Sequence, residues 1–135
     1  MRMGPRIIYM LSLIGSAIGI FYGIGYRSIG EMPEEEIVKV LTEFGLDTSD
    51  QVIGTIYRFA ANGVYYALFN ILEIIGVGML MRGDKRGFHA YAASQIGAVG
   101  VMTIVAGGGA TTYILWCGLW TYIYYKMMQS MTDER

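Results

Sequence analysis

The chain has 135 residues, of which 54% are hydrophobic and only 16% are charged, whereas typical soluble domains carry about 25% charged residues. A net charge of −1 excludes the broadly basic surface of a nucleic-acid-binding protein, so no nucleic-acid partner is expected. The single cysteine excludes an intramolecular disulfide. The length leaves room for one small domain, residues 1–135, and little else.

The first apolar segment, residues 7–26, contains no charged residue and follows Arg2 and Arg6. A signal peptide has the same basic start and apolar centre. This segment continues well beyond the small residues at 15–17, its one stretch suited to cleavage. We therefore interpret it as a retained membrane-spanning helix.

Glycines recur every fourth residue within this segment, at Gly15, Gly19 and Gly23. Small residues at this spacing allow two helix backbones to approach closely in a membrane. The pattern predicts a helix-packing face. Its partner is either another helix of the same chain or a separate subunit, as a dimer seam or a docking face.

Residues 33–44 form the one substantial segment expected outside the bilayer. Three glutamates, Glu34 to Glu36, suit the positive end of a helix dipole. Ile37, Leu41 and Phe44 recur at i, i+4 and i+7 and give one apolar face. We predict a short amphipathic helix on the outer membrane face, which serves as a shielded connector or as a docking or gating element.

The second predicted span, residues 59–81, carries one charged residue, Glu73. Glu73 lies nine residues before Arg82, or about 13 Å along a helix axis, which places it near the middle of a bilayer about 30 Å thick. Polar side chains at i, i+4, i+8 and i+11 extend from Glu73 along one helix face towards the outer surface: Asn62, Tyr66, Asn70 and Glu73.

The remaining spans are predicted at residues 87–106 and 110–128. Gly87 to Tyr125 contains no Asp, Glu, Lys or Arg, and the glycines at 107–109 divide it. Because each half is long enough to cross a bilayer, the stretch predicts two helices joined by a glycine turn. If the preceding hairpin turns around Asp84, Gln95 lies at the same depth as Glu73 and can donate a hydrogen bond to it.

Three interpretations of Glu73 follow. It is protonated and holds the bundle together through interhelical hydrogen bonds with Asn70 and Gln95. Alternatively, it is a proton or cation site in a transport path, with Asn62 and Tyr66 lining the outer approach. A third possibility is a pairing with a charge on another subunit.

No catalytic constellation is present in the sequence: it lacks the GxSxG, HExxH, CxxC and Walker patterns. His89 and Cys117 have no companion ligands close in sequence, so neither a metal site nor a cofactor is predicted. Trp116 and Trp120, at i and i+4, form a ridge that packs against lipid or another helix, or holds a pigment or quinone.

Together these features predict an all-α membrane protein with four transmembrane helices in an antiparallel bundle and the short outer helix. Seven basic residues would share one side of the membrane: Arg2, Arg6, Arg82, Lys85, Arg86, Lys126 and Arg135. Three would lie on the other: Arg27, Lys39 and Arg58. The positive-inside rule then predicts a multi-pass protein of the cell (inner or plasma) membrane with both termini cytoplasmic.

The turn Met81-Arg82-Gly83-Asp84-Lys85-Arg86 continues into Gly87-Phe88-His89-Ala90-Tyr91. It resembles uncharacterised small four-helix integral membrane proteins in which a basic turn leads into Gly-Phe-x-x-Tyr at the third helix. The resemblance implies the four-span arrangement and brings no activity with it.

The sequence favours a non-catalytic accessory or scaffold subunit, with the lipid bilayer and other membrane subunits or a second copy of itself as partners. The alternative is a small oligomeric transporter or channel that uses Glu73. A membrane enzyme subunit that takes its cofactor from a partner is the third hypothesis.

Overall fold

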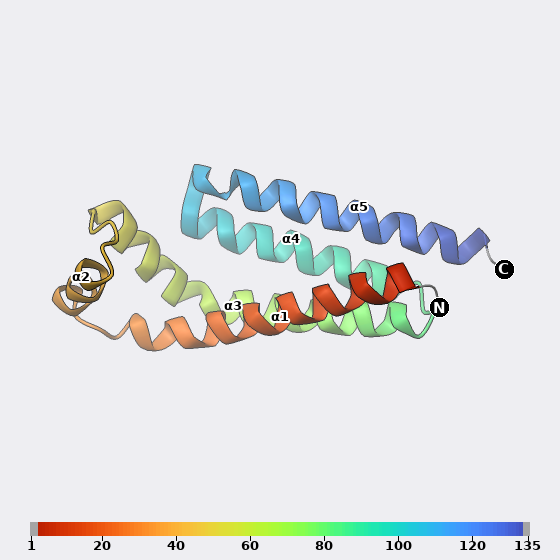
Figure 1. Ribbon diagram of the computed structural model, residues 1–135, viewed down its shortest axis with the longest axis horizontal. Coiled ribbons are helices and arrows are strands. Elements are labelled where there is room, and N and C mark those ends of the chain that lie inside the picture. Colours follow the sequence, from red (N-terminus) through yellow and green to blue (C-terminus); the bar gives the residue numbers. More distant parts are fainter. Residues whose placement is uncertain (1–2, 134–135) are drawn as a thin grey trace.

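The computed structural model describes residues 3–133, and this part of the chain is all-helical (Figure 1). Four long helices make up most of it: α1 (Met3–Ile29), α3 (Asp50–Met81), α4 (Gly87–Ala106) and α5 (Thr111–Asp133). A short helix, α2 (Glu34–Glu43), lies between α1 and α3, and a turn of 3-10 helix, η1 (Gly107–Ala110), joins α4 to α5. Arg2 and Arg135, which enter the charge count, lie outside the described residues.

Three helical stretches are long and apolar enough to cross a membrane: Gly4–Ile29, Asp50–Met81 and Gly87–Met131. The third comprises α4, η1 and α5, and it folds back on itself at the predicted glycine turn (Figure 1). Gly107 has a φ of 56° there, a conformation that costs an L side chain free energy and costs glycine little. The bundle is therefore an up-and-down arrangement in which both termini and the α3–α4 turn lie at one end (Figure 1).

The helices extend further than the apolar segments that predicted them. The span predicted at residues 59–81 is the later part of α3, which begins at Asp50, where Ser49 caps its first turn by accepting a hydrogen bond from the Val52 amide. α1 likewise begins before residue 7, at Met3, and α5 continues beyond residue 128 to Asp133. Hydropathy marks where a helix is apolar, whereas caps and backbone hydrogen bonds decide where it ends.

The α3–α4 turn is closed by a local ion pair. Arg86 places its guanidinium 2.8 Å from the Asp84 carboxylate, and its backbone amide donates a second bond to the same group. These hydrogen bonds from Arg86 hold the pKa of Asp84 below its usual value. Gly83, with a φ of 80°, supplies the left-handed residue that the turn needs.

Backbone contacts at glycines fix both α1 and α4 to α3. A Cβ added to Gly63 of α3 would collide with the backbone carbonyl of Gly23 of α1. Further along α3, a Cβ on Gly76 would lie 2.7 Å from the backbone nitrogen of Tyr91, and Gly87 packs closely there as well. The sequence leaves these positions without side chains, and the helices approach to backbone contact.

A buried aromatic cluster fills the bundle near the termini. It consists of Tyr9, Val77, Leu80, Tyr91 and Tyr124, and all five side chains are buried. The rings of Tyr91 and Tyr124 lie 4.0 Å apart between centroids, an interaction between α4 and α5. This end of the bundle therefore has the packed core of the molecule.

Helices α1 and α5 close the bundle incompletely. α1 packs along α3, and α3 along α4, whereas the backbones of α1 and α5 come close at few points of the described structure, and side chains such as Tyr9 and Tyr124 bridge them. One such point is the hydrogen bond that the Tyr124 hydroxyl donates to Ser12 Oγ, 2.6 Å long. A seam therefore runs between these two helices.

In the short helix α2 only part of the predicted apolar face is packed. Ile37 is buried, while Phe44, just after the helix, is 76% exposed. The Tyr57 hydroxyl of α3 donates a 2.8 Å hydrogen bond to the Met32 carbonyl, and this bond holds the segment just before α2 against α3. The short helix is thus attached at its beginning and exposed at its end.

Candidate functional site

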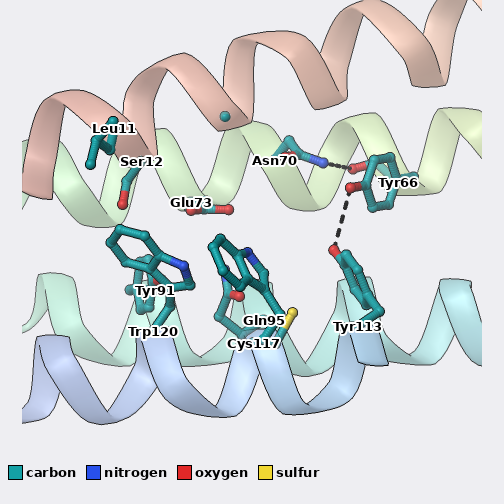
Figure 2. Close-up of a pocket in the computed structure, with 12 residues that line it drawn as sticks. Leu11, Ser12, Tyr66, Asn70, Glu73, Tyr91, Gln95, Tyr113, Cys117 and Trp120 are labelled. Carbon is teal, nitrogen blue, oxygen red and sulfur yellow. Dashed lines mark hydrogen bonds between the residues drawn. The ribbon is translucent and has the colours of Figure 1, made fainter. Parts of the chain in front are cut away.

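A cavity of about 160 Å³ with a mixed polar and aromatic lining lies between the four long helices (Figure 2). From α1 and α3 it is lined by Leu11, Ser12, Gly15, Tyr66, Asn70 and Glu73. From α4 and α5 it is lined by Tyr91, Gln95, Tyr113, Trp116, Cys117 and Trp120. The cavity combines one carboxyl group, two amides and several aromatic rings, so every long helix contributes to one site.

Glu73 extends from α3 into the middle of this group, with Ser12 and Trp120 to one side and Asn70 and Tyr66 to the other (Figure 2). Gln95 of α4 and Ser16 of α1 provide the hydrogen-bonding side chains nearest the carboxyl. The Ser16 hydroxyl is buried, yet it closes no hydrogen bond of normal geometry with any described residue. The polar side chains next to the carboxyl group are thus neutral.

No basic side chain balances this carboxyl group within the cavity. None of the lysines and arginines between residues 3 and 133 is among the lining residues. A buried carboxylate without a countercharge is unfavourable, because neutral hydrogen bonds replace only part of its hydration. Glu73 is half-buried, so it carries a proton, is hydrated within the cavity, or receives a cation from outside the chain.

The wall towards the α2 end is held by hydrogen bonds among the lining residues themselves. The Asn70 side-chain amide donates a 2.8 Å hydrogen bond to the Tyr66 carbonyl. The Tyr113 hydroxyl lies 3.3 Å from the Tyr66 hydroxyl (Figure 2). The Asn70 side chain occupies the space that a side chain at position 19 would need, so Gly19 makes room for it. These contacts fix the amide and both phenols at the edge of the cavity.

Aromatic rings form the wall on the α5 side. The indoles of Trp116 and Trp120 meet edge to face, with ring centroids 5.7 Å apart and an angle of 63° between planes. Trp116 is 57% exposed, so it lines the cavity and also reaches the molecular surface beside the α1–α5 seam. Cys117, by contrast, is buried.

The structure brings four of the predicted polar residues together: Glu73, Asn70, Tyr66 and Gln95. Asn62 does not line the cavity; its amide donates to the Arg58 carbonyl on its own helix. Arg58 in turn reaches across to the Val105 carbonyl at the end of α4, at 2.9 Å. The predicted polar path from Glu73 to the outer surface is therefore interrupted beyond Tyr66.

Of the three glycines predicted to form a packing face, Gly19 and Gly23 of α1 pack against α3, whereas Gly15 is exposed and a Cβ there would meet nothing within 4 Å. Gly15 lines the cavity, Gly19 borders Asn70, and Gly23 touches Gly63. α3 covers this face of α1 at Gly19 and Gly23.

Sequence reasoning did not connect the serines of α1 or the Trp116–Trp120 ridge with Glu73, and it left the ridge open as a lipid contact, a helix contact or a pigment or quinone site. Ser12, Tyr91, Tyr113, Trp116, Cys117 and Trp120 all border the cavity. The available signal was the i, i+4 spacing of Ser12 with Ser16 and of Trp116 with Trp120, which gives each outer helix one distinctive face. Their spacing could not show which partner each face would meet.

Comparison of the chain with protein-family models, curated proteins and solved structures found no match. The resemblance of the α3–α4 turn to uncharacterised four-helix membrane proteins gains no support from these comparisons.

Proposed function

We propose that this chain is an integral membrane protein in which α1, α3, α4 and α5 cross the bilayer. The three apolar helical stretches support the proposal. So do the large hydrophobic side chains on the outside of the bundle, such as Phe21 at 76% and Ile96 at 75% exposure. In water such surfaces would be strongly unfavourable, whereas lipid covers them at no cost.

The basic residues suggest the orientation. At the end of the bundle that holds the termini, the described basic residues are Arg6, Arg82, Lys85, Arg86 and Lys126. Towards the α2 end they are Arg27, Lys39 and Arg58. The positive-inside rule then makes the end with the termini cytoplasmic and puts α2 on the outer surface of the cell (inner or plasma) membrane. There α2 acts as an amphipathic interfacial helix, with Phe44 in the lipid headgroups.

The function that the cavity supports best is a proton or cation site in a small transporter. Glu73 carries this proposal, because its carboxyl group faces a cavity that offers no basic partner. Ionisable groups held inside a membrane domain at a cost of several kcal/mol commonly mark ion or substrate pathways. The interruption beyond Tyr66 indicates a site that opens by a movement of the helices, rather than a permanently open channel.

The test compares two variants with the unaltered protein in sealed proteoliposomes. Glu73→Gln removes the charge, and Glu31→Gln removes a carboxylate outside the cavity. Proton and cation flux should be lost in Glu73→Gln and retained in Glu31→Gln, with gel filtration and circular dichroism showing that both fold. Unchanged flux in Glu73→Gln would eliminate the transport role of this residue.

An accessory or scaffold subunit is the second candidate. It is favoured by outward-facing glycines, because a Cβ at Gly25, Gly100 or Gly118 would meet nothing within 4 Å. Surface positions without a side chain allow a helix of another subunit to approach closely. Its test is the native mass after gentle extraction: larger co-purifying chains support this function, and a chain that runs alone or as a closed homo-oligomer supports transport.

A further inference from the structure

We infer that the Glu73 cavity receives a small organic cation, a substituted ammonium with apolar groups, rather than a bare metal ion. This inference rests on the proposed function and specifies its substrate class. Its starting point is the composition of the cavity wall, where a single carboxyl group is combined with the rings of two tryptophans and three tyrosines.

The oxygen atoms of the cavity are poorly suited to a bare metal ion. Hard cations such as Mg²⁺ or Ca²⁺ take six or more oxygen ligands. Among the described residues, no three carboxylate, histidine or cysteine side chains come together. Several of the other polar groups are already engaged, since Ser12 accepts from Tyr124 and Tyr113 bonds to Tyr66.

Aromatic faces suit an organic cation because their π electrons attract positive charge without requiring the ligand to be stripped of strong hydration. Trp116 and Trp120 present two rings set at 63° to each other on one wall. Glu73 approaches the same space from α3, beside Trp120 (Figure 2). A substituted ammonium can place its charge near the carboxylate and its alkyl groups against the indoles.

The size of the cavity agrees with this class. It measures about 160 Å³, whereas a single water molecule needs at least about 10–15 Å³ of such space. A dehydrated metal ion would leave most of it empty. A ligand of several non-hydrogen atoms would fill it, and a large drug-sized molecule would not fit without movement of the helices.

The seam between α1 and α5 offers such a ligand a route from the bilayer. Leu11 of α1 and Trp116 of α5 line the cavity and are also 52% and 57% exposed. A cation with apolar substituents concentrates at the membrane interface, so it can reach the carboxyl group sideways, between the helices. Small inorganic ions lack this route.

The experiment uses the chain's own reporters, because its two tryptophans both line the cavity. Intrinsic fluorescence of the full chain in detergent is followed during titration with tetramethylammonium and tetraethylammonium chloride, with sodium chloride at equal ionic strength as the reference. We expect a saturable change with tetraethylammonium that is absent with sodium. Glu73→Gln should weaken it at least about 30-fold, Trp120→Leu about 10-fold, and Glu31→Gln should leave it unchanged.

The absence of a saturable response, or a response that Glu73→Gln does not weaken, overturns the inference. If Glu73→Gln fails to fold, Trp120→Leu decides, since Trp116 still reports binding and an unchanged affinity again overturns it. Glu73-dependent proton flux in proteoliposomes without a tetraethylammonium response would leave the proposed function standing and remove the organic cation. If neither a Glu73-dependent flux nor a tetraethylammonium response is observed, both the proposed function and the organic-cation inference are overturned.

Discussion

The hydroxyl of Tyr124 on α5 donates a 2.6 Å hydrogen bond to Oγ of Ser12 on α1, and both residues are buried. This bond lies beside the cavity, because Ser12 is also one of its lining residues. It joins α1 to α5, which also meet where the rings of Tyr9 and Tyr124 lie 5.9 Å apart between centroids. The bond therefore acts as a local fastening of the seam through which we expect a ligand to enter.

Replacing Tyr124 with Phe removes this fastening and keeps the aromatic ring in the core. The unfolding free energy should fall by about 1 kcal/mol, since a buried Ser12 hydroxyl is left without its donor. Chemical unfolding in mild detergent measures the change. Tyr122→Phe is the matched control, because that side chain is 58% exposed; equal losses in the two variants would show that the bond contributes nothing specific.

Gly63→Ala tests the close contact of α1 with α3. The added methyl group would meet the Gly23 carbonyl of α1, and overpacking of this kind costs about 1–3 kcal/mol. The thermal midpoint of the purified protein should fall accordingly. Gly25→Ala, where a Cβ meets nothing within 4 Å, should be neutral or slightly stabilising because alanine favours helix.

Gly107→Ala tests the reversal between α4 and α5. The φ of 56° at this position is disfavoured for an L side chain by about 1–3 kcal/mol. Gly108 adjoins it, has open space for a Cβ and carries no such φ restriction, so Gly108→Ala is the control. Thermal unfolding of the two variants should separate them, and similar midpoints would contradict a specific requirement for glycine at 107.

The Asp84–Arg86 pair predicts a pH dependence at the α3–α4 turn. Hydrogen bonds from Arg86 lower the pKa of Asp84 in the folded chain. The contribution of the pair to stability is therefore complete above the usual aspartate pKa of about 3.9 and is lost as the pH falls below it through the lower folded value. The pair is solvent-exposed, so the effect on stability should be small.

Carboxyl NMR titration of Asp84 measures that pKa directly. In Arg86→Gln the pKa should return towards its ordinary value, because the guanidinium donor is gone. A titration curve that does not move in this variant would show that the ion pair is not populated in solution.

Much of the arrangement could be predicted from the sequence. The absence of charge from Gly87 to Tyr125 and the glycines at 107–109 predicted α4 and α5 with their turn, and residues 87–106 match α4 to the residue. A long apolar run and a residue that permits reversal are both local properties. They need no knowledge of the rest of the fold.

The composition of the cavity could not be predicted in the same way. In a membrane helix the lipid-facing and the inward-facing sides are both apolar, so hydropathy does not show how a helix is rotated about its axis. From the sequence alone, Trp116 and Trp120 are therefore equally compatible with contact to lipid and with a place in the cavity wall. The inward orientation of Glu73 and Gln95 could be predicted, because a polar side chain in an apolar helix is unfavourable against lipid. The hairpin between the two helices sets both residues at the same depth.

The two glycine crossings on α3 lie on either side of Glu73, at Gly63 with α1 and at Gly76 with α4. Each crossing holds one neighbouring helix at backbone contact with α3, so together they position α1 and α4 around the Glu73 carboxyl group. A mutation at a lining residue away from both crossings, such as Trp116, can therefore change which ligand is preferred while α1 and α4 keep their places on α3.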